Sequence, residues 1–578
     1  MTIIAGYFGL GDAIDVPPTL EQEMRSALRR VDDARGQVTV ARKPGFYLCK
    51  WDSGAFGEPA WQESGRGEIS TLVGDPLFCD IGERRQRSEQ LASLDLFLDG
   101  IDQKLTSARG SFSLVCFSEE RRELRIATDI LGVRSLYYTV QDGLLVFASA
   151  IRILEAMPTI RRRISIIGTA EQCIYGQALG ARSPYEEISI LREAEYLTAG
   201  RSGVTVRRYF DWSQGSPYAG TEEQAAQQLY RHFLDGIRLR APPDERIIAF
   251  LSGGMDSRAI VASLIAAGHA VVALNFSPDG SQDQDYAVRF AEAAGPDCQL
   301  YCLPRDDDPN FSLLAARTKD SLEQGCLAGV QRPNVLWSGD GGSVGLGHVY
   351  MDEKMIDVIE REGIEKAAEY FMALHRNQLP IGVLEAPWRD QLPEDICRNV
   401  QAEIRRYPCS DTGRQLYLFL LINDQRRHLY KHFESIDEHG LEFITPFFDS
   451  VFLRTVAATP VRWGLLHRFY AHWFTHLPKF AQTTPWQTYP GHVECPIKCQ
   501  KELSYQWNRT VTRSSGPVTE RLPLAWQLAK SSCDPLSRNL FSRTRTLSLA
   551  LLEVFGMRNS RHALRTIQTF RSILARTN

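Results

Sequence analysis

Residues Phe250 to Ser257 read Phe-Leu-Ser-Gly-Gly-Met-Asp-Ser, which is the composition of an anion-binding turn. An apolar run over 246–251 predicts a strand that enters this turn, and helical apolar spacing over 257–267 predicts a helix that leaves it. The turn's backbone N–H groups and the helix N-terminus would then point at one spot. Asp256 would repel an anion there unless a cation lay between them. Its position therefore indicates Mg²⁺ bridging to pyrophosphate.

The usual nucleotide P-loop, Gly-x-x-x-x-Gly-Lys-Ser/Thr, does not occur in this sequence. A chance Gly-Gly turn before a helix is the alternative, and the strand and helix around the hexad make it the weaker one. Adenine and ribose are expected in the crevice at the strand ends, although Phe276 would serve equally well as ordinary core. The residues expected to bind the nucleotide are Leu251, Ser252, Gly253, Gly254, Asp256, Ser257, Phe276 and Gly339.

The elements that must position this turn alternate between strand and helix. Thr221-x-x-Gln224 is a capping-box signal for a helix, and strand-like runs recur at 270–276 and 335–337 with a helical pattern at 285–294 between them. This alternation predicts a parallel sheet with helices on both faces. The first ~210 residues instead favour short antiparallel strands, with Asp142-Gly143 as a hairpin turn.

Composition narrows the function classes. The chain has 578 residues, enough for two or three domains, and its formal net charge of −4 argues against nucleic acid as a partner. No apolar run approaches ~20 residues and no signal-peptide pattern begins the chain, so we expect no membrane span and a cytoplasmic protein. The 12 cysteines are expected to be reduced. The pairs His428/His432 and His472/His476 favour core or surface residues over metal sites.

Several further motifs occur in a fixed order along the chain. They are Thr128-Asp-x-x-Gly-x-Arg-x-Leu-Tyr-Tyr138, Arg207-Arg-Tyr-Phe-Asp211, Ser338-Gly-Asp-Gly-Gly-Ser343 and Pro446-Phe-Phe-Asp449. With these motifs the chain resembles the asparagine synthetase superfamily up to residue ~500, and the hexad resembles the pyrophosphate loop of ATP pyrophosphatases. Such enzymes cleave ATP to AMP and pyrophosphate while they adenylate a substrate.

The resemblance implies a fold. It implies an α+β amino-terminal glutaminase-like (Ntn-type) β-sandwich domain over 1–212. An α/β parallel-sheet ATP pyrophosphatase synthetase domain, with a helical carboxyl-terminal part, would follow over 213–510. Residues 511–578 are basic and are expected to form a helical extension whose arginines face solvent.

Departures from the family pattern point to the nitrogen source. Glutamine-dependent members expose a Cys at position 2, where this chain has Thr2. An N-terminal Thr can itself be a nucleophile. The glutamine-binding Arg and the Asn-Gly segment of those members are not found, and Asp75-Pro-Leu-Phe78 stands where they are expected. The first domain therefore looks degenerate, and the attacking amine should belong to the substrate.

Two subfamilies use an amine of the substrate, namely β-lactam synthetases and lasso peptide macrolactam synthetases. The extended second turn, Ser338 to Tyr350, and Trp486-Gln-x-Tyr-Pro-Gly-His492 look most like the lasso peptide cyclases. That reading implies ATP and Mg²⁺ as cofactors and a leader-cleaved precursor peptide as substrate, with a leader-binding protein and a leader peptidase as partners. A β-lactam-type synthetase, a glutamine- or ammonia-dependent asparagine synthetase and a catalytically dead scaffold are the alternatives. The intact hexad argues against the last.

The resemblance also suggests roles for single residues. Ser343 replaces the Asp that binds metal in the family, so Asp256 and Asp340 are the predicted Mg²⁺ ligands. Lys498 is the candidate for stabilising the oxyanion of the second step, with a surface charge as the equal alternative. Glu442 and His348 are weaker catalytic candidates. Glu442 could belong to an acid/base pair or be a structural carboxylate, and a structural role is favoured for Asp449. His348 could be a general base, but a hydrogen-bonded structural histidine is the favoured alternative.

Overall fold

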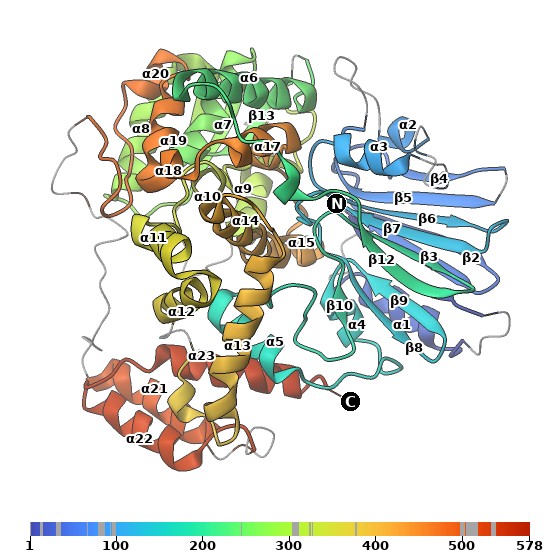
Figure 1. Ribbon diagram of the computed structural model, residues 1–578. Coiled ribbons are helices and arrows are strands. Elements are labelled where there is room, and N and C mark those ends of the chain that lie inside the picture. The colour runs from blue at the N-terminus through green and yellow to red at the C-terminus, as the bar shows by residue number, and fades with distance from the viewer. Residues whose placement is uncertain are drawn as a thin grey trace.

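The computed structural model describes residues 2–11, 16–30, 36–65, 67–78, 87–92, 94, 97, 100–243, 245–302, 311–322, 325, 327–375, 379–497, 503, 518–532, 534 and 539–577. Lys498 lies outside these residues. Two antiparallel sheets, a parallel sheet covered by helices and a carboxyl-terminal group of helices occupy separate parts of the molecule (Figure 1).

The amino-terminal part is a β-sandwich of two six-stranded sheets. One sheet has the order β10-β8-β9-β1-β3-β2, and its strands are β1 (Thr2–Gly9), β2 (Gln37–Lys43), β3 (Phe46–Asp52), β8 (Tyr137–Gln141), β9 (Leu144–Ala148) and β10 (Ser189–Ile190). The other has the order β12-β11-β7-β6-β5-β4, and its strands are β4 (Trp61–Glu63), β5 (Glu68–Gly74), β6 (Phe112–Ser118), β7 (Glu123–Thr128), β11 (Glu195–Gly200) and β12 (Gly203–Arg208). An apolar layer that includes Ile4, Phe46 and Phe117 fills the space between them. The hairpin at Asp142-Gly143 joins β8 to β9 as predicted.

The predicted parallel sheet is confirmed, with the strand order β15-β14-β13-β16-β17. Its strands are β13 (Ile247–Phe250), β14 (Val271–Asn275), β15 (Cys298–Cys302), β16 (Val335–Trp337) and β17 (Glu442–Ile444). Helices α6 (Glu222–Arg240), α7 (Met255–Ala266) and α8 (Gln282–Ala294) accompany the first strands, and both hydrogen bonds of the Thr221/Gln224 capping box form. The direction of winding reverses between β13 and β16. In open α/β sheets this reversal creates a ligand crevice at the carboxyl ends of the strands.

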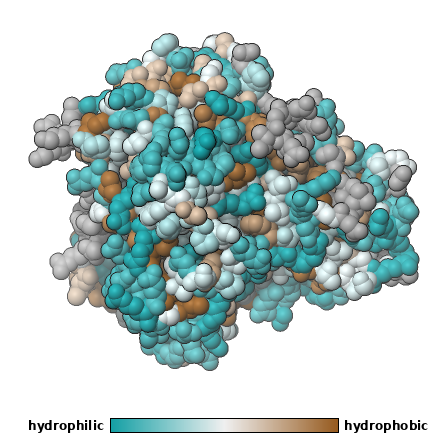
Figure 2. Space-filling view, turned by 45° about the horizontal axis from the view of Figure 1, so that its top comes forward, coloured by the Kyte–Doolittle hydropathy of each residue, from teal (hydrophilic) through white to brown (hydrophobic). Residues whose placement is uncertain are grey.

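Helices dominate the rest of the chain. The longer ones between β16 and β17 include α13 (Trp388–Arg405) and α14 (Thr412–Gln425), and the last three are α21 (Val518–Ser531), α22 (Arg543–Val554) and α23 (Arg561–Leu574). Helix α23 packs beside α5 (Ile166–Tyr175) of the first domain (Figure 1). No helix among the described residues is long and apolar enough to cross a bilayer. The face in Figure 2 is mostly hydrophilic with scattered apolar spots.

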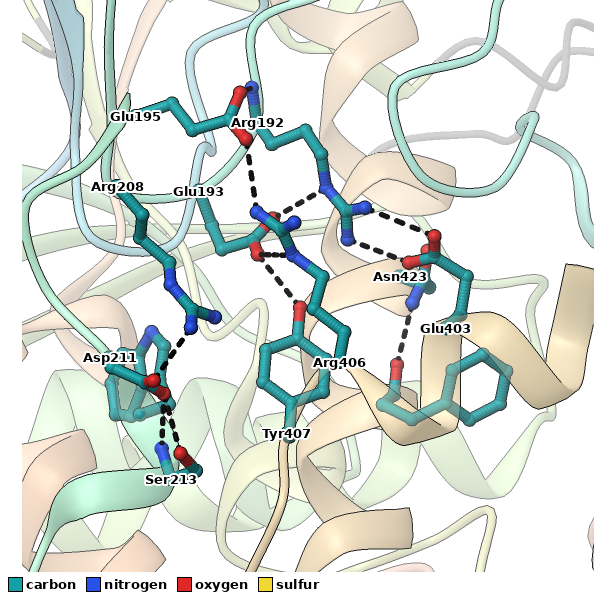
Figure 3. Close-up of polar contacts among 12 residues, drawn as sticks. Arg192, Glu193, Glu195, Arg208, Asp211, Ser213, Glu403, Arg406, Tyr407 and Asn423 are labelled. Carbon is teal, nitrogen blue, oxygen red and sulfur yellow. Dashed lines mark hydrogen bonds and ion pairs between the residues drawn. The ribbon is translucent and has the colours of Figure 1, made fainter. Parts of the chain in front are cut away.

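Buried ion pairs join the sandwich to the helical part. Arg192 forms a two-pronged pair with Glu403 of α13, with N–O distances of 3.0 and 2.6 Å. Arg406 in turn bonds Glu193 at 2.9 Å and Glu195 at 3.0 Å, so two arginines and three carboxylates form one network (Figure 3). Arg192, Glu193 and Glu403 are buried. Separation of the sandwich from the helical part would therefore leave these charges unpaired.

Two further pairs fasten the sandwich directly to the parallel-sheet domain. Arg134 bonds Glu442 of β17 at 2.7 Å, and both side chains are buried. Arg109 bonds the Asp449 carboxylate at 2.8 Å, and Arg240 of α6 bonds the same oxygen at 3.0 Å. The first domain is thus a rigid support for the elements around the crevice.

Candidate active site

The turn after β13 and the turn after β16 lie against each other at the predicted crevice. A Cβ atom on Gly339 would lie 2.6 Å from the backbone of both Asp256 and Ser257, and one on Gly342 would lie 2.7 Å from the Asp256 carboxyl carbon. Real side chains do not tolerate such distances, so the two turns approach this closely because they carry glycine. The Ser-Gly-Gly-x-Asp-Ser hexad and the Ser-Gly-Asp-Gly-Gly-Ser hexad therefore build one site.

Asp256 is the centre of that site. Its carboxylate accepts hydrogen bonds from the Ser343 backbone N–H at 2.9 Å, the Ser343 hydroxyl at 3.0 Å and the Tyr470 hydroxyl at 2.8 Å. Burial raises the pKa of Asp256 to about 6; the three donors oppose this rise, and the charge of Asp340 adds to it. Ser343 thus holds Asp256 in place, where an aspartate at the same position would repel it.

The donor set is compatible with Mg²⁺. A carboxylate has about four lone-pair sites. Three donors reach Asp256, so one site remains for a cation. Asp340 is exposed, lies near enough to raise the pKa of Asp256 and accepts a hydrogen bond from Ser338 at 2.6 Å. Two neighbouring carboxylates match the oxygen ligands that Mg²⁺ prefers.

The hexad itself is held in shape by short hydrogen bonds. The Ser252 N–H donates to the Ser257 hydroxyl at 2.8 Å, and the Gly253 N–H donates to the carboxylate of Asp283 at 2.8 Å. Helix α7 begins at Gly254 without any side-chain cap. Its first N–H groups are therefore available to an anion, because the N-terminal turn of a helix lacks intrahelical acceptors.

A cavity of about 150 Å³ opens in front of the hexad. Its lining includes the predicted residues Ser252, Gly254 and Asp256 but not Leu251, Gly253, Ser257, Phe276 or Gly339. Phe276 instead packs edge-on against Phe250. The remaining lining residues are Met255, Asp283, Ser343, His467, Gln487, Thr488, Tyr489, His492 and Val493. Sequence reasoning missed Asp283, Tyr470 and His467, which carry no motif of their own.

Two histidines form the wall of this cavity opposite the hexad. The Nδ1 atoms of His467 and His492 are 2.5 Å apart, so one ring donates a hydrogen bond to the other. Burial and the neighbouring His492 lower the pKa of His467 to about 3, and burial lowers the pKa of His492. Leu466 and His467 have φ of 56° and 62°, a left-handed conformation that non-glycine residues rarely adopt. Such strain persists only where the surroundings enforce it and is concentrated at functional sites.

A second, larger pocket of about 470 Å³ adjoins the first, because His492 lines both. Its wall is largely apolar and includes Met355, Phe371 and Phe419. Tyr350 lines it and lies 3.3 Å from His428, whose Nε2 atom is 3.4 Å from Asp424, so a polar chain runs along one side. His428 stands in a short π-helical turn (Arg426–Tyr430), a distortion often found at functional sites.

The structure places the remaining catalytic candidates away from the cavity. Glu442 is buried and pairs with Arg134, a setting that fits the structural carboxylate among the two roles predicted for it. His348 is buried, its Nδ1 atom lies 3.1 Å from the Val461 carbonyl, and burial lowers its pKa to about 4. This setting fits the structural histidine that the sequence favours over a general base. Lys498 falls outside the described residues, so its role stays a prediction.

The amino-terminal residue is also engaged in structure. The Thr2 hydroxyl donates to Asp52 at 3.1 Å, and Thr2 is buried. Lys50, fully buried, lies 3.5 Å from the same carboxylate and donates to three backbone carbonyls. Arg87 approaches Asp52 from the other side at 3.8 Å. Two basic side chains and a carboxylate thus surround Thr2, and burial lowers the pKa of Lys50 to about 7.

Two segments of the chain match known families. Residues 88–210 match the glutamine amidotransferase domain, and residues 228–319 match asparagine synthase. Asparagine synthetase [glutamine-hydrolyzing] 3 of Bacillus subtilis is 30% identical over 233 residues, which are 39% of this chain and 36% of that protein. The match to the first family begins at residue 88, after the amino-terminal strands.

Other relatives are more distant. Amidase chry2 of Gibberella zeae is 26% identical over 54% of this chain and 47% of its own length. The chain therefore spans less than half of each of these two relatives. Among solved structures, the glutamine phosphoribosylpyrophosphate amidotransferase of B. subtilis covers 52% of this chain and 81% of its own at 10% identity and a TM-score of 0.25.

Proposed function

Because its two matched domains are those of the asparagine synthetase family, we propose that this chain is an ATP-dependent, AMP-forming amide ligase that closes the macrolactam of a ribosomally made lasso peptide. The observation that carries the proposal is the pair of turns that meet at Asp256, in front of a cavity and at the switch point of the sheet. The peptide substrate and the partner proteins are inferred from the resemblance of residues 338–350 and 486–492 to lasso cyclases.

The first step is adenylation of a side-chain carboxylate of the peptide. Its oxygen attacks the α-phosphorus of ATP and pyrophosphate leaves. The helix start at Gly254 and the Ser252 hydroxyl would hold the departing β,γ pair, and Asp256 with Asp340 would hold the Mg²⁺ that offsets its charge. Fixed donors suit this task because they need no reorganisation as the charge develops.

The second step is attack of the peptide's own amino terminus on the acyl carbon, with AMP as the leaving group. The ammonium group must first lose a proton, and a neutral imidazole can accept it. His467 and His492 are kept neutral by burial and stand between the two cavities. We assign the proton acceptor to His492, which lines both cavities, and the role of its hydrogen-bond partner to His467, because a pKa of about 3 makes His467 a poor base.

The amine is assigned to the substrate because Thr2, the first residue that the structure describes, is not exposed as a nucleophile would need to be. Thr2 is buried and bonded to Asp52, and Lys50 occupies the space beside it. The large apolar pocket next to the nucleotide cavity suits a folded peptide better than free ammonia or an amino acid. A leader-cleaved precursor peptide is therefore the proposed substrate, supplied by a leader-binding protein and a leader peptidase.

A second candidate is a glutamine-dependent asparagine synthetase. The relationship to the B. subtilis enzyme, whose name specifies glutamine hydrolysis, favours it. The two functions differ in one measurable product, because only the second releases glutamate. Incubation with glutamine, ATP and Mg²⁺ should yield none. Glutamate release at turnover rates that is lost in Thr2→Ala would overturn the assignment of the amine.

The adenylation site is tested by ATP–pyrophosphate exchange. Asp256→Ala should abolish exchange and leave the fold intact, whereas the control Asp297→Ala, an exposed carboxylate, should not change it. Unchanged exchange in a folded Asp256→Ala protein would refute the site.

For the complete reaction, the product mass should equal the leaderless peptide minus one water, with AMP formed one-for-one. His492→Gln should spare exchange more than ring closure.

A further inference from the structure

We propose that Glu223, His472 and His476 form a binding site for a zinc-class divalent cation that joins the start of α6 to the end of α19 (Arg468–Phe474). The ligand atoms of these three side chains all lie within 4.8 Å of one another. The site is separate from the nucleotide cavity, and it does not depend on the proposed function. The four-residue spacing of the two histidines by itself favours surface residues. Glu223, some 250 positions earlier, adds a third ligand that only the folded chain brings beside them.

The distances suit a single cation. The Nε2 atom of His472 is 2.7 Å from one carboxylate oxygen of Glu223, and the Nε2 atom of His476 is 3.7 Å from the other. Ligands around a tetrahedral zinc with bonds of ~2.0–2.1 Å stand roughly 3.3 Å apart. The observed distances lie on either side of this value, so small side-chain rotations would bring all three atoms onto one ion.

His476 provides the second line of evidence. Its Nε2 atom is buried and makes no hydrogen bond to any residue that the structure describes, although it lies 3.7 Å from the Glu223 carboxylate. An unsatisfied buried nitrogen is costly, because it gives up its bond to water and receives nothing in return. A metal ion bound at the nitrogen lone pair would remove this cost. The ring also stacks on Tyr230 at a centroid distance of 6.3 Å.

Glu222 sets the tautomer of His472. Its carboxylate lies 3.2 Å from the Nδ1 atom, where it accepts a hydrogen bond from that nitrogen. A cation that displaces the Nε2 proton, which otherwise donates to Glu223 across 2.7 Å, would bind the Nε2 lone pair while Nδ1 keeps its proton for Glu222. A carboxylate behind a metal-binding histidine is the usual outer contact of zinc sites, where it orients the ring and increases its basicity.

The donor set selects the class of metal. Two imidazoles favour zinc and related transition metals over Mg²⁺ or Ca²⁺, which prefer oxygen ligands. Three protein ligands leave a fourth position for water, and the partial exposure of Glu223 gives solvent access to it. The site therefore differs in chemistry from the carboxylate pair at Asp256.

The position of the site connects it to the nucleotide loop. Helix α19 carries His472 near its end. The same helix carries Tyr470, whose hydroxyl donates to Asp256, and it begins directly after His467, which lines the nucleotide cavity. A cation that fixes the end of α19 against α6 would hold these side chains in register with the hexad. We therefore expect the metal to stabilise the protein and its active-site wall together.

The test uses the full chain, stripped of metal with a chelator and titrated with Zn²⁺ alone in a calorimeter. Wild type and Asp256→Ala should each bind Zn²⁺ with the same high affinity at one site. Glu223→Gln, His472→Ala and His476→Ala should each lose at least about tenfold in that affinity, and Glu222→Gln about 10–100-fold. The exposed His562→Ala is the matched control and should bind like wild type.

Thermal unfolding supplies a second readout. Zn²⁺ should raise the midpoint of wild type and of His562→Ala, because a ligand that binds only the folded state stabilises it. Zn²⁺ should not change the unfolding midpoint of Glu223→Gln. Without metal, Glu223→Gln and wild type should unfold at about the same midpoint. Equal zinc affinity in wild type and Glu223→Gln, or the absence of tight binding to wild type, would overturn the site.

Discussion

Removal of the Tyr470 hydroxyl should move the pH dependence of adenylation toward higher pH. Asp256 must be ionised to bind a cation, and its pKa is about 6. At pH 5 only about a tenth of the carboxyls would be ionised, so kcat/KM for Mg·ATP in pyrophosphate exchange should be roughly tenfold lower there than at pH 8. This limb belongs to the free enzyme, which kcat/KM reports.

The size of the shift follows from the contacts of Asp256. A hydrogen bond to a charged group contributes about 1.5–3 kcal/mol, and one pKa unit corresponds to about 1.36 kcal/mol. Tyr470→Phe removes the 2.8 Å bond and leaves both donors of Ser343. The acidic limb should therefore rise by about one unit, to near pH 7, which would roughly halve the rate at neutral pH and leave the alkaline plateau largely intact.

Asp340→Asn is the opposite perturbation. It removes a like charge that raises the pKa of Asp256, so the acidic limb should move to lower pH while the plateau falls through loss of a metal ligand. The assay is ATP–pyrophosphate exchange at limiting Mg·ATP from pH 5 to 9. If the limb stays at the wild-type pH in both variants, Asp256 is not the group that titrates, and the reasoning fails.

Three further predictions concern packing and charge. Gly342→Ala should abolish exchange in a folded protein, because its Cβ would lie 2.7 Å from the Asp256 carboxyl carbon; Gly382→Ala, with open space around it, should have no effect. Glu403→Ala should lower the free energy of unfolding by about 3–5 kcal/mol in urea, because it leaves Arg192 buried and unpaired. Asp102→Ala, in the exposed pair with Arg207, should cost less than about 1 kcal/mol, and equal costs would contradict the interface assignment. Burial alone would raise the pKa of Asp449, but Arg240 and Arg109 hold that pKa below its usual range. The ionised Asp449 therefore stabilises the folded protein above the unfolded pKa of about 3.9, and this stabilisation is lost as the pH falls through the folded pKa. Asp449→Asn should make urea stability less dependent on pH below about 4, and an unchanged slope would argue against this linkage.

Local sequence was enough to predict the elements that carry the nucleotide loop. The strand before the hexad, the helix after it, the capping box at Thr221 and the Asp142-Gly143 hairpin all depend on contacts between near neighbours in the chain. Their periodicity and turn chemistry are therefore visible without a structure. The position of Asp256 in the first turn of the helix after the hexad is local in the same way.

Only the tertiary structure determined which residues surround Asp256 and which candidates are excluded from it. Tyr470 reaches Asp256 from 214 positions away and His467 faces it across the cavity, yet neither carries a motif. Glu442 has the sequence context of a catalytic acid, but its partner Arg134 is 308 positions distant and removes it from the site. The chemistry of a carboxylate or an imidazole depends on burial and on its neighbours in space, and these are decided by how the two domains pack rather than by the order of residues along the chain.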